Sequence, residues 1–124
     1  MAKILVIDDD EQLRVMLLQL LTSAGHAVVT AHDGAAGLKQ LRAHPTDLVI
    51  TDILMPNQDG IETVIALRRE YPHLPVIAMS GDFARSVLWL KTARLLGARC
   101  TLPKPFTLTQ LKQAIAEVLA AHPY

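Results

Sequence analysis

Short runs of apolar residues alternate along the chain with longer stretches in which apolar residues recur every three or four positions. Three of the short runs are continuous and rich in Val and Ile, which is typical of strands buried on both faces of a parallel sheet. The five runs occupy residues 4–7, 27–30, 48–51, 76–79 and, more weakly, 99–102. The pattern predicts five strands in a parallel sheet that helices cover.

Helical periods separate these runs. Gly25 follows the first period and is well suited to end a helix, and Thr107 precedes the last one as an expected N-cap. The residues from about 84 to 96 are less regular, because Val87-Leu88-Trp89-Leu90 is apolar on all sides of a helical turn. The expected regular helices lie at about 13–24, 35–43, 61–71 and 108–119.

The sum of these elements is five β-α units, which predicts an α/β domain with a doubly wound sheet. Right-handed crossovers between parallel strands place helices on both faces of such a sheet. Ligands bind in these folds at the carboxyl ends of the strands, where the strand order reverses. At 124 residues the chain has the usual size of one domain, so we expect residues 1–124 to form a single domain.

Composition narrows the class of protein. Apolar residues make up 51% of the chain and charged residues 19%, which indicates a globular protein rather than a disordered one. The formal net charge of zero argues against a general nucleic-acid or membrane binder. Cys100 is the single cysteine, so no internal disulfide can form, and no apolar run approaches a membrane span or a secretory signal. We therefore expect a cytoplasmic protein.

Polar residues stand where the expected strands end. Asp8 and Asp9 follow the first strand, Asp52 the third, Ser80 the fourth and Lys104 the fifth. If the first and third strands are neighbours, the three carboxylates converge on one crevice. Two unit charges 4 Å apart repel by roughly 4 kcal/mol at an effective dielectric constant of about 20, so either protons or a cation must relieve the repulsion there.

A hard divalent ion suits a site made of oxygen ligands, and Mg²⁺ fits well because it shares its coordination with carboxylates, waters and a phosphoryl group. Lys104 adds a second positive charge and Ser80 a hydroxyl donor, so the site favours a bound phosphoryl group. Asp52 is the best candidate nucleophile, because it stands alone at the centre of the crevice, and Asp8 and Asp9 then have to bind the metal. A carboxylate that attacks phosphorus forms an acyl phosphate.

Four segments that contain these residues resemble the receiver domain of two-component response regulators, with the fold of the single-domain chemotaxis regulators. They are residues 4–11, 47–60, 76–81 and 104–106. The resemblance extends over essentially the whole chain and implies the flavodoxin-like strand order 2-1-3-4-5. It also implies a phosphorylation-dependent switch that catalyses only its own phosphorylation and dephosphorylation, rather than an enzyme with an external substrate.

The resemblance implies a role for each residue of the crevice. Asp52 matches the phosphoacceptor, and Ser80 and Lys104 match the hydroxyl and the lysine that contact the phosphoryl group, with a cis bond between Lys104 and Pro105. The metal would be Mg²⁺, for which Mn²⁺ is a possible substitute. Its implied protein ligands are Asp8, Asp9, Asp52 and the backbone carbonyl of Leu54.

The implied partners are a sensor histidine kinase or a histidine phosphotransfer protein as phosphoryl donor, and an output protein that binds around the fourth helix, fifth strand and fifth helix. Direct contacts with nucleic acid or membrane are not expected. The family usually has Tyr or Phe at the position of Thr101, so this departure predicts that the phosphorylated state is signalled differently. A stand-alone receiver is favoured, with a part of a longer protein as the alternative.

Other readings of the same residues stay open at this point. Asp8 and Asp10 form a D-x-D pair, as in haloacid-dehalogenase-like phosphatases, although Gln12 stands where that family has Thr or Val. A flavodoxin-like cofactor binder would need a Ser-, Thr- or Gly-rich loop after the first strand, where this chain has acids. We expect Asp10 to cap the first helix, and Asp59-Gly60 to serve turn formation and capping.

Overall fold

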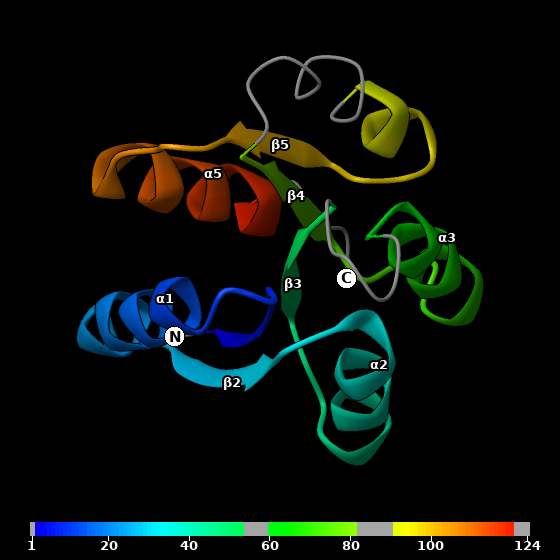
Figure 1. Ribbon diagram of the computed structural model, residues 1–124, viewed down its shortest axis with the longest axis horizontal. Helices are drawn as coiled ribbons and strands as arrows, with labels where there is room; N and C mark the ends of the chain where they lie inside the picture. Colours follow the sequence, from blue (N-terminus) through cyan, green and yellow to red (C-terminus); the bar gives the residue numbers. More distant parts are fainter. Residues whose placement is uncertain (1, 54–59, 82–90, 121–124) are drawn as a thin grey trace.

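Figure 1 shows the computed structural model of the protein, which describes residues 2–53, 60–81 and 91–120. Five parallel strands form one sheet in the order β2-β1-β3-β4-β5. The predicted fold class and strand order are thus confirmed. The strands are β1 (Lys3–Ile7), β2 (Ala27–Ala31), β3 (Leu48–Asp52), β4 (Val76–Ser80) and β5 (Cys100–Pro103).

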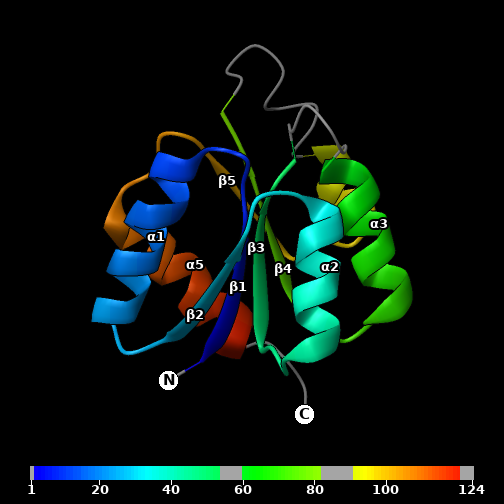
Figure 2. The same ribbon diagram turned by 60° about the horizontal axis from the view of Figure 1, so that its bottom comes forward.

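Helices cover both faces of this sheet (Figure 2). On one face α1 (Glu11–Ser23) and α5 (Leu108–Ala120) pack in one apolar cluster with the strands. On the other face α2 (Gly34–Ala43) and α3 (Gly60–Glu70) share a second cluster. Residues 91–95 are also helical, and Ala93 joins the second cluster. The two clusters are the two halves of a core that the sheet divides.

The position of each strand in the sheet explains its apolar pattern. Every residue of β3 and β4 is buried, and only Lys3 of β1 is exposed. The edge strand β2 instead alternates, with Ala27 and Val29 exposed. Continuous Val- and Ile-rich runs therefore mark the strands that helices cover on both sides, as the sequence predicts.

Local hydrogen bonds set the ends of the helices. The Asp10 carboxylate accepts hydrogen bonds from the backbone N–H groups of Gln12 and Leu13, which confirms its role as the N-cap of α1. The Thr107 hydroxyl accepts one from Gln110 N–H at 3.1 Å at the start of α5, as expected. Gly25, after α1, has φ 95°, a left-handed conformation that favours glycine.

Most of the irregular segment 84–96, including Trp89, lies outside the described residues. None of the helices in the described part of the chain is both long and apolar enough to cross a lipid bilayer.

Candidate functional site

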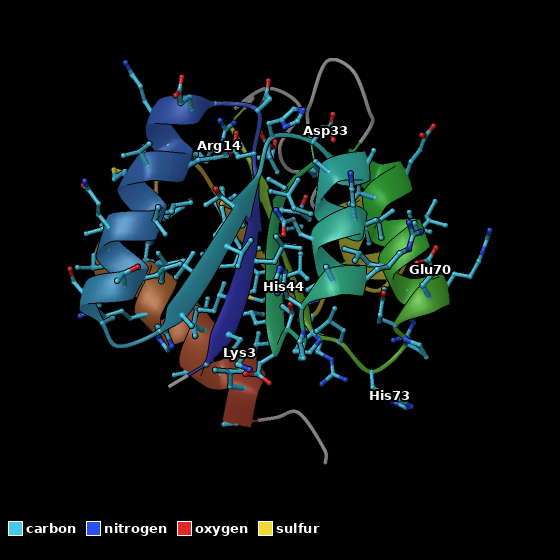
Figure 3. All side chains as sticks on the ribbon, turned by 90° about the horizontal axis from the view of Figure 1, so that it is seen from below. Lys3, Arg14, Asp33, His44, Glu70 and His73 are labelled. Atoms are coloured by element: carbon cyan, nitrogen blue, oxygen red, sulfur yellow. The ribbon has the colours of Figure 1, made fainter. Side chains whose placement is uncertain are left out.

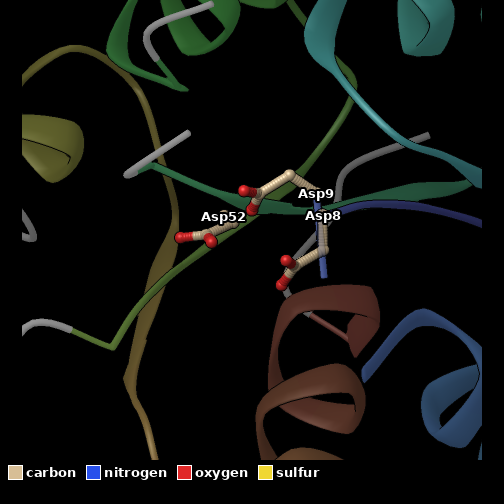
Figure 4. Close-up of side chains that lie close together, drawn as sticks. All are labelled: Asp8, Asp9 and Asp52. Carbon is tan, nitrogen blue, oxygen red and sulfur yellow. The ribbon is translucent and has the colours of Figure 1, made fainter. Parts of the chain in front are cut away.

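An acidic cluster lies at the carboxyl edge of the sheet. Asp8 directly follows β1 and Asp52 ends β3, and the pairing of Ile7 with Thr51 places these two strand ends side by side. One carboxylate oxygen each from Asp8, Asp9 and Asp52 lies within 4.8 Å of the others (Figure 4). The predicted convergence of the three carboxylates is thus present.

Burial differs sharply among the three acids. Asp8 has no exposed surface and Asp52 is 5% exposed, whereas Asp9 is exposed. Two carboxylates withdrawn from water next to each other need positive charge nearby. The exposed Asp9 leaves one side of the cluster open to solvent, so an ion can enter from there.

Lys104 supplies one positive charge to the cluster. Its Nζ donates hydrogen bonds to Oδ2 of Asp8 at 2.8 Å and to Oδ2 of Asp52 at 3.2 Å. Burial alone would lower the pKa of the Lys104 ammonium, but its hydrogen bond to Asp8 and the charge of Asp52 outweigh this effect and raise the pKa above its ordinary value. Lys104 is therefore a positively charged bridge between the ends of β1 and β3.

The backbone around Lys104 holds this side chain in place. Lys104 N–H donates to the Ser80 carbonyl at 2.8 Å, which ties the end of β5 to the end of β4. The bond between Lys104 and Pro105 is cis, as the family resemblance implies. The lysine thus reaches the cluster from a position defined by two neighbouring strands.

Ser80 ends β4, beside β3, and is completely buried. Its hydroxyl oxygen finds no hydrogen-bond partner in the described part of the chain. Buried hydroxyl groups are nearly always hydrogen-bonded, so an unpaired one at a strand end points to a ligand that would accept from it. A phosphoryl oxygen meets this requirement.

Hydrogen bonds fix both the side chain and the backbone of Asp8. Its Oδ1 accepts from Asp10 N–H at 2.9 Å and its Oδ2 from Lys104, and its own N–H donates to Ala31 O at 3.1 Å. Its carbonyl oxygen accepts from Arg14 Nη1 at 2.8 Å. The sequence reasoning missed Arg14, and the only available signal was a basic residue in the first turns of the helix that follows the acids.

The start of α3 lies directly against the end of β3. A Cβ atom on Gly60 would fall on backbone atoms of Asp52 and Ile53. Gly60 was expected to serve a turn, and the structure adds that it allows this close approach beside the candidate nucleophile. Leu54, whose carbonyl was expected to bind the metal, and Asp59 lie outside the described residues.

The donors present fit a hard divalent cation. The cluster offers carboxylate oxygens from three residues, which is the ligand type that Mg²⁺ prefers, and one lysine does not neutralise three carboxylates. The buried Ser80 hydroxyl and the Lys104 ammonium lie at the same strand ends and can donate hydrogen bonds to an anion. The site can therefore hold a cation and an anionic group together.

Comparison with known proteins agrees with this geometry. The model of the response regulator receiver domain matches residues 4–116. The chain belongs to this family. Among curated relatives, the transcriptional regulatory protein CpxR of Escherichia coli (strain K12) is 40% identical over 121 residues, which are 96% of this chain and 50% of CpxR. The DNA-binding transcriptional regulator NtrC of Rhizobium meliloti (strain 1021) is 36% identical over 119 residues, or 96% of this chain and 24% of NtrC.

Solved structures of receiver domains have the same fold. Chemotaxis protein CheY4 of Vibrio cholerae superposes with a TM-score of 0.87 at 31% identity, with 96% of this chain and 99% of that chain covered. A response regulator receiver domain protein of Clostridium thermocellum gives 0.85 at 32% identity, with 97% and 95% covered. The chain thus spans nearly all of these receiver domains, but only a quarter to a half of the two curated relatives above.

The receiver family is not a classical enzyme family, and the phosphatase alternative based on Asp8 and Asp10 is not supported. The family model accounts for the chain from residue 4 to residue 116. The Asp10 carboxylate is engaged with the backbone of α1. Neither finding supports Asp8 and Asp10 as the D-x-D pair of a phosphatase.

Proposed function

We propose that this receiver domain is a switch in which Asp52 accepts a phosphoryl group, and that residues 1–124 form one such phosphoacceptor domain. The observation that carries the proposal is the position of Asp52 among complementary groups. Asp52 is the last residue of β3, and Ser80 ends the neighbouring strand β4. Lys104 bridges the nearly buried carboxylate of Asp52 to that of Asp8. A negative charge added at Asp52 would meet both a cation and a hydroxyl donor.

The chemistry needs few groups. A carboxylate oxygen of Asp52 attacks the phosphorus of a phosphohistidine, the P–N bond breaks, and the imidazole nitrogen keeps the electron pair and takes a proton from solvent. The product is an acyl phosphate on Asp52. Phosphoryl transfer of this kind depends mainly on positioning and charge neutralisation. Lys104 and the Ser80 hydroxyl would contact the transferred oxygens, so the domain catalyses only its own phosphorylation and dephosphorylation.

Asp8, Asp9, Asp52 and the Leu54 carbonyl are proposed to hold Mg²⁺, with Mn²⁺ as a substitute. The ion would neutralise charge on the acids and on the phosphoryl oxygens. Both Asp8 carboxylate oxygens already accept hydrogen bonds, from Asp10 N–H and Lys104, whereas Asp9 is exposed. This difference supports Asp9 as a direct ligand and Asp8 as one that acts largely through water.

A sensor histidine kinase or a histidine phosphotransfer protein is the proposed donor, and an output protein would bind the face around β5 and α5. Thr101 on that face is half-buried. A hollow of about 260 Å³ lies beside it, with Phe106, Gln110 and Glu117 among its lining residues. Since no aromatic ring occupies position 101, the phosphorylated state would be signalled through other groups of this face.

The decisive experiment is labelling with phosphoramidate and Mg²⁺, followed by mass spectrometry of the intact protein. Asp52→Asn is expected to abolish the mass increase, as is chelation of Mg²⁺. Asp47→Asn is a matched control, because Asp47 precedes the same strand at its opposite end, where its carboxylate accepts from Lys3 N–H. Undiminished labelling of Asp52→Asn would overturn the assignment. Phosphotransfer from a panel of histidine kinases would then identify the donor.

A further inference from the structure

The carbonyl group of Asp8 lies one residue beyond the regular pairing of β1. The ladders with β2 and β3 end at Ile7, and within the described residues Asp8 continues this pattern through its N–H bond to Ala31 O alone. Arg14 supplies the missing partner, because its guanidinium Nη1 donates to the Asp8 carbonyl at 2.8 Å. Figure 3 shows Arg14 on α1, at the end of the molecule where β1 stops.

This carbonyl belongs to the peptide group that joins Asp8 to Asp9. A hydrogen bond to its oxygen restrains the plane of that peptide and therefore the direction in which the Asp9 side chain starts. Within the residues that the structure describes, no hydrogen bond restrains the Asp9 carboxylate itself. The position of the exposed Asp9 carboxylate in the cluster is consequently set by the Asp9 backbone. The hydrogen bond from Arg14 to the Asp8 carbonyl restrains that backbone.

Arg14 is itself anchored at the same turn. Its N–H donates to the Asp10 carbonyl at 3.0 Å, in the first turn of α1 that the Asp10 carboxylate caps. The guanidinium and the main chain of one residue thus bind both sides of the Asp8–Asp10 turn. Groups that orient metal ligands in this way typically change metal affinity 10–100-fold when they are removed.

We propose that Arg14 is a positioning residue for the divalent cation, which sets the Asp8–Asp9 peptide so that the Asp9 carboxylate meets the ion. The inference rests on the proposed function, since it concerns the same metal site. It assigns Arg14 an effect on metal affinity and not on the phosphoryl group, because the guanidinium binds a backbone carbonyl and not the carboxylates.

The test compares Arg14→Met, which keeps the apolar stem but removes the donors, with Arg14→Lys, which keeps the charge and one donor group. Arg42→Met is the matched control, because the Arg42 guanidinium also donates hydrogen bonds, to Glu70 at 3.1 Å, but does so between α2 and α3 and far from the acidic cluster. Two quantities are measured for each variant. One is the dissociation constant of Mn²⁺, from the electron paramagnetic resonance signal of the free ion, and the other is the rate of phosphoramidate labelling as a function of Mg²⁺ concentration.

Arg14→Met is expected to raise the Mn²⁺ dissociation constant and the half-saturating Mg²⁺ concentration about tenfold, with the labelling rate at saturating Mg²⁺ retained within about threefold. Arg14→Lys should fall between Arg14→Met and the wild type, and Arg42→Met should equal the wild type. A purely structural arginine would change the resistance to urea and neither metal quantity.

Wild-type metal affinity in a folded Arg14→Met protein would overturn the inference, as would a lower maximal rate at an unchanged half-saturating concentration. If Arg14→Met does not fold, Arg14→Gln, which is uncharged and shorter, carries the same expectation and the same refuting result. Failure of the proposed function looks different, because the wild-type protein would then bind no Mn²⁺ or remain unlabelled.

Discussion

Replacing Asp9 with Asn should stabilise the metal-free protein while it weakens metal binding. Asp9 adds a third negative charge to the cluster, and inside the described residues its carboxylate gains no hydrogen bond or ion pair in return. Asn has nearly the same shape, so the substitution removes charge with little change in packing. The change in the free energy of unfolding on Asp9→Asn therefore measures the repulsion between the Asp9 carboxylate and the other two carboxylates of the cluster.

The magnitude follows from the distances. The carboxylate oxygens lie within 4.8 Å of one another, and at that upper limit two of them repel by about 0.9 kcal/mol in bulk water and by roughly 3.5 kcal/mol at an effective dielectric constant of about 20. Asp9 feels two such charges, from Asp8 and Asp52, and the positive charge of Lys104 offsets about one of them. Because Asp9 is exposed, the screened end of this range applies to the one net repulsion that remains, and we expect a gain of about 1 kcal/mol.

Urea unfolding followed by circular dichroism tests this expectation. In EDTA, the midpoint of Asp9→Asn should lie roughly 0.3–1 M above that of the wild type, for the slope of about 1–3 kcal/mol per molar that small domains show. The difference should shrink in 1 M NaCl, and Mg²⁺ should stabilise the wild type more than the variant. Asp47→Asn removes one charge far from the cluster and should leave the midpoint nearly unchanged. An Asp9→Asn protein less stable than the wild type in EDTA would refute the reasoning.

Three other substitutions or treatments have definite expected results. Ser80→Ala removes a buried hydroxyl without a described partner, so the free energy of unfolding should change by less than about 0.5 kcal/mol, while phosphoramidate labelling should slow at least about tenfold. Unchanged labelling would contradict the role of Ser80. Gly60→Ala forces a Cβ onto the backbone of Asp52 and Ile53. Urea denaturation should therefore show a loss of about 2 kcal/mol or more in the free energy of unfolding, and labelling should fall. Wild-type stability would show that the close approach is not required. Burial raises the pKa of the Cys100 thiol. A disulfide reagent at pH 8 should therefore react more slowly with the folded than with the urea-unfolded protein, and the rate for the folded protein should still increase above pH 9. Equal rates at pH 8 would contradict this shift in pKa.

The strand ends could be located from the sequence because buried parallel strands have an unambiguous signature. The Val- and Ile-rich runs before Asp8 and Asp52 are covered on both faces, and parallel strands bring their carboxyl ends to one edge. The convergence of Asp8, Asp9 and Asp52 therefore needed only the assumption that β1 and β3 are neighbours. The caps formed by Asp10 and Thr107 were equally accessible, because they depend on residues a few positions away.

Contacts between elements could not be predicted in the same way. The bond from Arg14 to the Asp8 carbonyl depends on how α1 leaves the sheet, and sequence spacing carries no information on that angle. The close approach of Gly60 to Asp52 likewise requires the start of α3 to be docked. Even for Lys104, the residue type indicated a positive charge at the site, but its bridging of Asp8 and Asp52 depends on the path of the chain after β5.

The acidic cluster also explains why this fold joins stability to signalling. The sheet buries two carboxylates at its edge, with one lysine between them, and the cluster keeps an excess of negative charge. Under the proposed function, cation binding or phosphorylation of Asp52 would each change the electrostatic forces on the same strand ends. Since Lys104 N–H binds the Ser80 carbonyl, any movement of the lysine toward a new anion acts directly on β4 and β5. We therefore propose that a route from phosphorylation of Asp52 to the β5–α5 face would begin at Lys104 and would not require an aromatic side chain at Thr101.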